Sequence, residues 1–248
     1  MVDRDASAYG DTHAEVYDRI YGARFDPTLA VAALADAAGP GGRVLELGLG
    51  TGRLAIPLLR HGLQVDGIEA SRAMIDRLHA HPGGTRVGVY RADLAEFDLP
   101  RHDYDVAVCA VSTLFMLPGR AAQQGCIASA ARHLRPGGRL FIETFRPDPG
   151  RFDAAGHRVE TRPAPDGGAH VVRSRHDPAQ CCIHITHELS DGSGNAAYSV
   201  TLHYAPPQQL DQMARLAGLR LIARWHDWTA TPANESSADP ISIYTLDP

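Results

Sequence analysis

Short apolar runs alternate with amphipathic stretches along roughly the first 145 residues of the chain. Residues 43–48 and 104–112 are largely apolar, which is typical of strands buried on both faces of a parallel sheet. Residues 52–62 and 120–134 instead carry apolar side chains at helical spacing. This alternation predicts an α/β fold with a mostly parallel sheet.

Glycine and serine mark where several of these elements begin and end. Gly62 ends the predicted helix at 52–62, and Ser71 is placed to cap a helix at 72–81. The remaining predicted elements are helices at 14–25 and 26–42, strands at 63–71, 85–94 and 139–145, and a turn at 135–138.

The pattern changes after residue 145. Residues 146–203 hold many Gly, Pro, Asp and His residues between short β-like runs, which indicates an antiparallel insertion. A helix at 206–218 and strands at 219–228 and 240–246 then return to the earlier pattern. We therefore expect an N-terminal helical lid at 1–40, a cofactor-binding α/β core at 41–145, an antiparallel lid insertion at 146–203 and the C-terminal part of the core at 204–248.

Gly48, Gly50 and Gly52 occupy alternate positions where the first predicted strand passes into a helix. Glycine at such a junction permits positive φ and lets a ligand approach the free backbone N–H groups of the helix N-terminus. A phosphate-binding P-loop would need a lysine, but all 24 basic residues of this chain are arginine. The dinucleotide-binding pattern would need its third glycine at the position of Arg53.

The stretch ELGLGTG (46–52) resembles the E-x-G-x-G-x-G motif of class I S-adenosylmethionine-dependent methyltransferases. The stretches VDGIEAS (65–71), RADL (91–94) and HLRPGGRLFIET (133–144) resemble further motifs of that family in the same order. The resemblance implies a Rossmann-like fold with a seven-stranded, mostly parallel sheet and an antiparallel β insertion after the fifth strand. It also implies S-adenosyl-L-methionine as the cofactor and S-adenosyl-L-homocysteine as the product.

The same resemblance assigns cofactor contacts to residues at the ends of the strands. Glu69 follows the glycine turn by about 20 residues, where its carboxylate can accept both ribose hydroxyls. Asp93, with the Leu94 backbone beside it, would contact the adenine amino group, and such acidic side chains disfavour a pyrophosphate ligand. The implied cofactor contacts are Tyr17, Glu46 (to backbone or water near the methionine moiety), Gly48, Gly50, Glu69, Ala70, Asp93, Leu94 and the Ala110 carbonyl (to the cofactor ammonium).

The leader AYGDTHAEVYD (8–18) resembles the N-terminal lid of the deoxyamino-sugar N,N-dimethyltransferases, which also carry an antiparallel insertion after strand 5. In that subgroup the tyrosine at the position of Tyr9 lies against the reactive methyl group, and Tyr17 would line the cofactor site from the same lid. The sugar enzymes have a histidine base where this chain has Met116. An acceptor other than a sugar amine is therefore at least as consistent with the sequence.

An acceptor amine must lose a proton at some stage, whereas a phenol or enol needs a base first. His203 is the favoured base, with His184 and His187 as alternatives, although a half-exposed structural histidine is the commoner role of such a residue. Tyr9 is the second predicted catalytic residue. The predicted substrate contacts are Thr113, Phe115, Met116 and Tyr21.

Three further features have ordinary structural explanations. Trp225 or Trp228 could cover an apolar acceptor, but core packing is the commoner role of tryptophan on a late strand. Arg146 or Arg151 could bind a substrate carboxylate, although surface arginines are usually solvated. The stretch CCIHITHE (181–188) offers only two possible metal ligands on each strand face, so we expect no metal site.

Charge and cysteine content narrow the list of partners. A formal net charge of −5 gives no reason to expect nucleic acid or an anionic membrane as a partner. The N-terminus is acidic rather than signal-like, and no apolar run approaches the ~20 residues of a membrane span. The four cysteines form no C-x-x-C pair, so we expect reduced thiols and a cytoplasmic protein.

The sequence thus predicts an enzyme that transfers a methyl group to N, O or C of a small molecule, in secondary metabolism. One alternative is a non-methylating enzyme on the same fold, such as a cyclase, which would not accumulate S-adenosylhomocysteine with product. A second is a non-catalytic binding scaffold. The exposed insertion could also pair two subunits as a homodimer.

Overall fold

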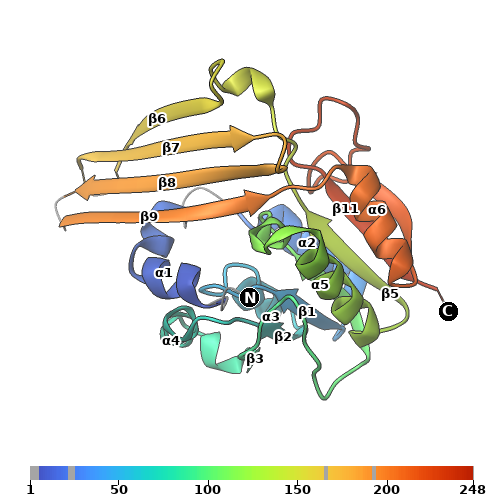
Figure 1. Ribbon diagram of the computed structural model, residues 1–248. Helices are drawn as coiled ribbons and strands as arrows, with labels where there is room; N and C mark the ends of the chain where they lie inside the picture. The colour runs from blue at the N-terminus through green and yellow to red at the C-terminus, as the bar shows by residue number, and fades with distance from the viewer. Residues whose placement is uncertain (1–5, 22–25, 165–166, 192–193, 248) are drawn as a thin grey trace.

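The computed structural model describes residues 6–21, 26–164, 167–191 and 194–247. A central sheet carries helices on both faces, and a second sheet stands beside it (Figure 1). The helices are α1 (Ala8–Tyr21), α2 (Thr28–Ala38), α3 (Ala55–Arg60), α4 (Arg72–Ala80), α5 (Gly119–His133) and α6 (Pro207–Leu216), with 3₁₀ turns η1 (Gly84–Arg86), η2 (Thr113–Met116) and η3 (Pro149–Arg151). The strands are β1 (Arg43–Leu47), β2 (Gln64–Ile68), β3 (Gly88–Tyr90), β4 (Tyr104–Cys109), β5 (Leu134–Glu143), β6 (His157–Pro163), β7 (Ala169–Asp177), β8 (Cys182–Asp191), β9 (Gly194–His203), β10 (Leu219–Trp225) and β11 (Ile241–Leu246).

The central sheet has seven strands in the order β10-β11-β5-β4-β1-β2-β3. Strands β1 to β5 run parallel, and β11 pairs antiparallel with both β5 and β10. The carboxyl ends of β1, β2 and β4 therefore meet at one edge, where open α/β sheets bind their ligands. This mostly parallel seven-stranded sheet confirms the predicted fold class.

Two apolar clusters cover the two faces of the sheet, as the alternation along β4 illustrates. Ala107 and Cys109 face one cluster together with Met213 of α6, whereas Val106 and Val108 face the other together with Leu34 of α2. All of these side chains are buried. The continuous apolar run of this strand is thus explained by burial on both sides.

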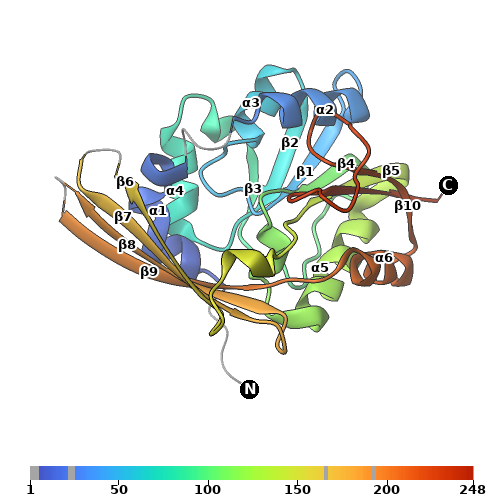
Figure 2. The same cartoon turned by 90° about the horizontal axis from the view of Figure 1, so that it is seen from above.

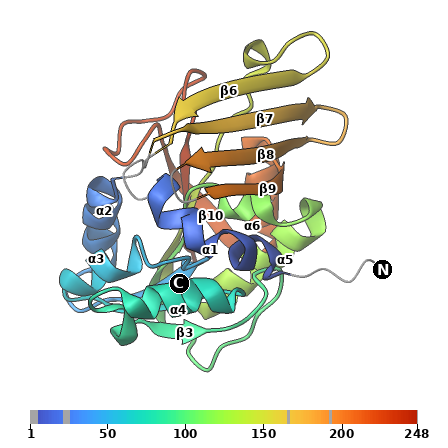
Figure 3. The same ribbon diagram turned by 90° about the vertical axis from the view of Figure 1, so that its left-hand side faces the viewer.

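The second sheet consists of β6-β7-β8-β9, antiparallel throughout, and confirms the predicted antiparallel insertion after the fifth strand. We call it the lid sheet. Helix α1 lies across its β9 side (Figure 3), and from above α1 lies between the lid sheet and α4 (Figure 2). A Cβ on Gly10 would lie 2.3 Å from the Cβ of Ser71, so α1 approaches the start of α4 as closely as backbones allow.

Local signals placed most element ends correctly. The Ser71 hydroxyl accepts a hydrogen bond from Met74 N at 3.2 Å and caps α4, and Gly62 ends the α3 region with φ +82°. The turn predicted at 135–138 is instead part of β5, where the pairing with β4 is irregular. No helix in the described parts of the chain is both long and apolar enough to cross a membrane.

Candidate active site

The glycine loop joins β1 to α3 at the carboxyl edge of the sheet. Gly48, Gly50 and Gly52 all adopt positive φ, and the N–H groups of Gly48 and Leu49 both donate to the Ile68 carbonyl at 3.0 Å. A Cβ on Gly52 would lie 2.3 Å from a Leu78 methyl group, so this glycine is required by packing. A Cβ on Gly50 would lie 3.9 Å from the Tyr17 hydroxyl, so the Tyr17 ring borders the loop at this glycine.

Glu69 follows β2 and holds the glycine loop from beside it. Its two carboxylate oxygens each accept a backbone hydrogen bond at 2.9 Å, one from Gly50 N and one from Ser71 N. Burial raises the pKa of Glu69, while these backbone hydrogen bonds oppose the shift. The carboxylate therefore joins the loop to the start of α4.

Glu46 of β1 is buried, and its Oε2 has no hydrogen-bond partner among the described residues. Burial raises its pKa to about 8, against the lowering effect of the Arg53 charge. A buried acceptor without a partner is costly unless a ligand or water completes it. The residue thus suits a site that receives a charged or polar donor next to the glycine loop.

Helix α1 closes over the loop through two acidic residues that the sequence analysis missed. Asp18 accepts a hydrogen bond from the Thr51 hydroxyl at 2.6 Å and pairs with His81 at 3.0 Å. Asp11 accepts a hydrogen bond from the Ser71 hydroxyl at 2.6 Å. The two aspartates lie two helical turns apart on one face of α1, and that spacing is the signal that could have identified them.

Tyr17, the predicted cofactor contact from the N-terminal helix, lies next to Gly50 of the glycine loop. Its hydroxyl would lie 3.9 Å from a Cβ on Gly50, and burial raises its pKa to about 12. A cavity of about 290 Å³ opens beside it, under α1. Tyr17, Tyr21, Thr51, Arg53, Ile56 and His81 are among its lining residues.

The predicted adenine end is less enclosed. Asp93 is half-buried beyond the end of β3, and its Oδ1 accepts a hydrogen bond from Ala95 N at 2.8 Å. Leu94 between them is half-buried, and the Ala70 carbonyl accepts a hydrogen bond from Arg91 Nε at 3.1 Å. These residues border the same edge of the sheet as Glu69, because Glu69 N donates to the Tyr90 carbonyl at 3.1 Å.

Comparison with known proteins identifies the family to which the chain belongs. Residues 44–138, which carry the glycine loop, Glu69 and Asp93, match a family model described as a methyltransferase domain. The solved structure of the CcbJ methyltransferase from Streptomyces caelestis is 36% identical, with a TM-score of 0.89 over 99% of this chain and 100% of that one. The chain belongs to the class I S-adenosylmethionine-dependent methyltransferases.

Two further relatives extend over nearly the whole methyltransferase. The cypemycin N-terminal methyltransferase of a Streptomyces species is 27% identical over 96% of this chain and 98% of its own length. CalS10, an amino pentose methyltransferase from Micromonospora echinaspora solved with S-adenosylmethionine bound, is 23% identical over 93% of this chain and 96% of that one, with a TM-score of 0.71. At that identity the CalS10 comparison shows the fold alone.

The residues of the methyltransferase fit its cofactor, S-adenosylmethionine. Glu46 Oε2 offers a buried acceptor that nothing among the described residues satisfies, and a cavity of about 290 Å³ opens beside Thr51 and Gly52 of the loop. Glu69 adds a second carboxylate beside the loop. The side chains at this site are carboxylates, which accept hydrogen bonds. They suit a ligand that carries hydroxyl and ammonium donors and no phosphate.

The turn after β4 also borders the glycine loop of the methyltransferase. The Ala110 carbonyl accepts from Thr113 N at 3.1 Å and from the Thr113 hydroxyl at 2.8 Å, so this carbonyl already has two donors. The Thr113 methyl group lies 2.7 Å from where a Cβ on Gly48 would be. Phe115 is fully buried edge-on against Phe145, a core contact, and Met116 beside it is half-buried.

A cluster of tyrosine and histidine rings joins α1 to the inner face of the lid sheet. The Tyr21 and Tyr198 hydroxyls lie 3.2 Å apart, and burial raises the pKa of Tyr9 next to them. The His13 ring stacks on Tyr9 with centroids 4.2 Å apart and meets Tyr198 edge-on at 3.6 Å. The structure therefore brings the predicted residues Tyr9 and Tyr21 together with His13 and Tyr198, which the sequence analysis missed.

The two ring nitrogens of His13 differ in their hydrogen bonding. Its Nδ1 hydrogen-bonds to the Tyr9 carbonyl one helical turn earlier, so Nδ1 carries the proton and Nε2 the lone pair. The Nε2 atom has no partner among the described residues, and the residue is only 1% exposed. Burial lowers the pKa of His13, which keeps this nitrogen unprotonated at neutral pH.

The predicted bases on the lid sheet separate into two groups. His187 is buried, stacks on Tyr198 at 4.3 Å and hydrogen-bonds to His170 at 3.0 Å. His184 and His203 belong to the opposite face, because side chains alternate along β8 and β9. The structure thus places His187 with the tyrosine cluster and His203 away from it.

The remaining sequence candidates have structural partners. Trp225 and Trp228 pack on Phe141 with centroids 5.9 and 6.1 Å away, which is the core role considered for them. Arg146 donates to the carbonyls of residues 234 and 235, both at 3.2 Å. Arg151 lies 3.9 Å from Glu160, an exposed ion pair.

A cluster of Asp98, His102 and His133 brings three possible metal-ligand atoms within 4.8 Å of one another. His133, however, uses both ring nitrogens: Nδ1 contacts the Ser129 carbonyl at 2.7 Å and Nε2 accepts from Leu99 N at 2.8 Å. A metal would have to displace a buried backbone hydrogen bond, so the geometry favours a satisfied core histidine.

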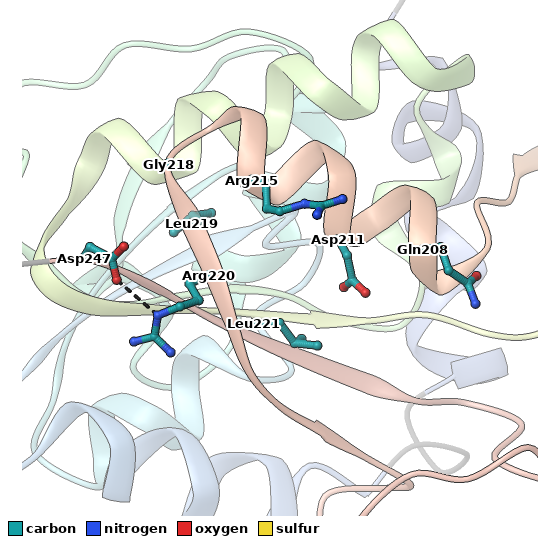
Figure 4. Close-up of a pocket in the computed structure, with 8 residues that line it drawn as sticks. All are labelled: Gln208, Asp211, Arg215, Gly218, Leu219, Arg220, Leu221 and Asp247. Carbon is teal, nitrogen blue, oxygen red and sulfur yellow. Dashed lines mark hydrogen bonds and ion pairs between the residues drawn. The ribbon is translucent and has the colours of Figure 1, made fainter.

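A larger cavity of about 590 Å³ lies between α6 and β10 (Figure 4). The glycine loop follows β1, whereas β10 is an edge strand of the central sheet, separated from β1 by β11, β5 and β4. The cavity is therefore distant from the glycine loop. Three of its charged side chains are paired: Arg220 with Asp247 at 3.3 Å, and Asp211 with Arg224 at 2.6 Å. We assign it no role in the reaction.

Proposed function

We propose that this methyltransferase methylates an amine nitrogen of a small natural-product molecule. The observation that carries this proposal is His13, whose buried Nε2 lone pair meets no partner in the part of the chain that the structure describes and lies in the ring cluster between α1 and the lid sheet. The cypemycin enzyme, similar over nearly the whole chain, acts at an amino terminus according to its name, which supports nitrogen as the attacked atom.

The cofactor side of the site is formed by the glycine loop, Glu46, Glu69, Asp93 and Tyr17. Glu69 would accept the ribose hydroxyls, Asp93 with the Leu94 backbone and Ala70 would border the base, and Glu46 would satisfy donors near the methionine moiety. S-adenosylmethionine, when bound, supplies a methyl group on a positively charged sulfur. Helix α1, held by the Asp18 and Asp11 contacts, would cover this region and exclude water from it.

On the acceptor side, Tyr9, Tyr21 and Tyr198 would orient the amine, and Thr113 and Met116 would bound it from the turn after β4. An aliphatic amine is protonated at neutral pH and has no lone pair for attack. His13 Nε2 would accept one proton from that ammonium, becoming an imidazolium, and the nitrogen would keep the electron pair. The lid sheet would hold the acceptor close, which converts binding into effective concentration.

Oxygen or carbon acceptors are the second candidate, because Tyr9 and Tyr21 could also orient a phenol. A cyclase-like enzyme and a non-catalytic scaffold are both disfavoured by membership in the methyltransferase family and by the intact Glu46 and Glu69. Pairing of two subunits through the insertion stays a prediction.

The test uses purified protein, S-adenosylmethionine and matched acceptors: a set of cyclic and acyclic secondary amines, peptides with free amino termini, and the phenol analogue of each. We expect S-adenosylhomocysteine to accumulate in step with a product heavier by one methyl group in the amine set. Product in the phenol set alone would refute nitrogen methylation.

A further inference from the structure

The turn after β4 is the most strained backbone in the described part of the site. Val111 and Ser112 have φ values of 50° and 58°, and two consecutive non-glycine residues in the left-handed region are uncommon. Val111 is β-branched, so its side chain makes this conformation especially unfavourable. Such a turn persists only where the surrounding structure fixes it.

Glu143, the last residue of β5, holds this turn through both its side chain and its main chain. Its Oε2 accepts a hydrogen bond from Val111 N at 2.7 Å, and its main-chain carbonyl accepts from Ser112 N at 3.2 Å. The two strained residues thus direct their N–H groups at one neighbouring residue on the adjacent parallel strand.

Trp228 in turn orients the Glu143 carboxylate. Its indole Nε1 donates to Glu143 Oε1 at 3.1 Å, and its ring stacks on Phe141 with an interplanar angle of 19°. Both carboxylate oxygens therefore have fixed donors. The tryptophan comes from the segment between β10 and β11, distant in sequence from the turn that it affects.

The strained turn positions what lies beyond it. Thr113 hydrogen-bonds back to the Ala110 carbonyl and presses its methyl group into the space over Gly48. Strands β1 and β4 run parallel, and Glu46 pairs with Val108 near their carboxyl ends. Two residues further along, Gly48 and Ala110 follow, so the turn and the glycine loop are neighbours at one edge of the sheet. A turn that relaxes to negative φ would move Thr113 and the Ala110 carbonyl away from the loop.

We propose that Glu143, oriented by Trp228, is a positioning residue that holds the strained turn 111–113 against the glycine loop and thereby sets the affinity for the cofactor. The inference rests on the cofactor of the proposed function but not on its acceptor. Failure to methylate any amine would leave it standing, and its own failure would leave the amine assignment standing.

The test is titration calorimetry with S-adenosylhomocysteine. The isosteric Glu143→Gln keeps one acceptor oxygen but places an amide N–H₂ against the second donor. We expect the Kd for S-adenosylhomocysteine to rise about tenfold. Trp228→Phe keeps the ring on Phe141, removes only the indole donor, and should raise Kd by about threefold.

A second substitution tests whether Glu143→Gln acts by releasing the strained turn or by general damage to the fold. Glycine adopts φ +50° without penalty, so Glu143→Gln with Val111→Gly should return Kd to within about threefold of wild type. The matched control is Ala230→Gly, which relieves a positive φ of 63° outside the turn and should leave the Glu143→Gln defect in place. Wild-type Kd in Glu143→Gln, or equal rescue by the two glycines, would overturn the inference. If Glu143→Gln does not fold, an unchanged Kd in Trp228→Phe overturns it.

Discussion

Asp18 of α1 accepts a 2.6 Å hydrogen bond from the hydroxyl of Thr51, in the middle of the glycine loop. The lid helix is therefore bonded to the loop that it covers, and not only packed on it. Asp18 also pairs with His81 at 3.0 Å, and Asp11 holds Ser71 at 2.6 Å. If the cofactor binds at the glycine loop, we expect its release to require these contacts to open together with α1.

Thr51→Val should accelerate cofactor release, since it removes the donor to Asp18 and preserves the shape of the side chain. Loss of one hydrogen bond to a charged acceptor corresponds to about 1.5–3 kcal/mol, or at least a tenfold faster dissociation. Stopped-flow fluorescence of S-adenosylhomocysteine release would measure it. Thr186→Val, which removes a 3.0 Å contact to Ser199 in the lid sheet, is the matched control and should leave the rate unchanged.

Glu69→Ala should weaken cofactor binding by about 1–3 kcal/mol, because it removes a charged acceptor from two hydroxyls. The variant also loses the hydrogen bonds that Glu69 accepts from Gly50 N and Ser71 N. Its thermal stability should therefore fall as well. Calorimetry and a melting curve separate the two effects. Unchanged affinity with a lower Tm would remove the ribose assignment and leave a structural role.

The sequence identified the parts of this site that depend on local patterns. The glycine loop and the Ser71 cap follow from the residues at a strand–helix junction, and these were predicted at the correct positions. The Asp18 and His13 contacts could not be predicted, because they depend on how α1 docks on the loop and on β9. Likewise, strand alternation places His203 and Tyr198 on opposite faces, but only the packing of α1 shows which face is turned to the site.

Glu46→Gln should flatten the dependence of stability on pH in the ligand-free protein. Unfolded Glu46 ionises near its ordinary pKa of 4.5, whereas the folded carboxyl keeps its proton up to about pH 8. The folded state binds more protons in that window, so wild-type stability falls as pH rises from 4.5 through about 8. Urea unfolding at a series of pH values measures this slope. A slope in Glu46→Gln equal to that of wild type would show that another group is responsible.

His13→Gln should slow methyl transfer to an amine most strongly where the amine is protonated. General base catalysis contributes about 10²–10⁴-fold, and glutamine keeps the polarity of the position without a comparable basic nitrogen. The rate of the variant should therefore rise with pH and approach wild type once free amine predominates in solution.

The pH profile of kcat/KM separates this role from a structural one. The His13 ring contacts Tyr9 and Tyr198, and Tyr198 in turn stacks on His187. These are therefore the other titratable groups near the His13 imidazole. His187→Gln is the matched control, because His187 is also buried in the same ring cluster but has its own partner in His170. We expect the control to lower the rate by a similar factor at every pH. Parallel profiles for wild type and His13→Gln would assign proton removal to solvent or to another residue, and the basic nitrogen of His13 would then have only a packing role.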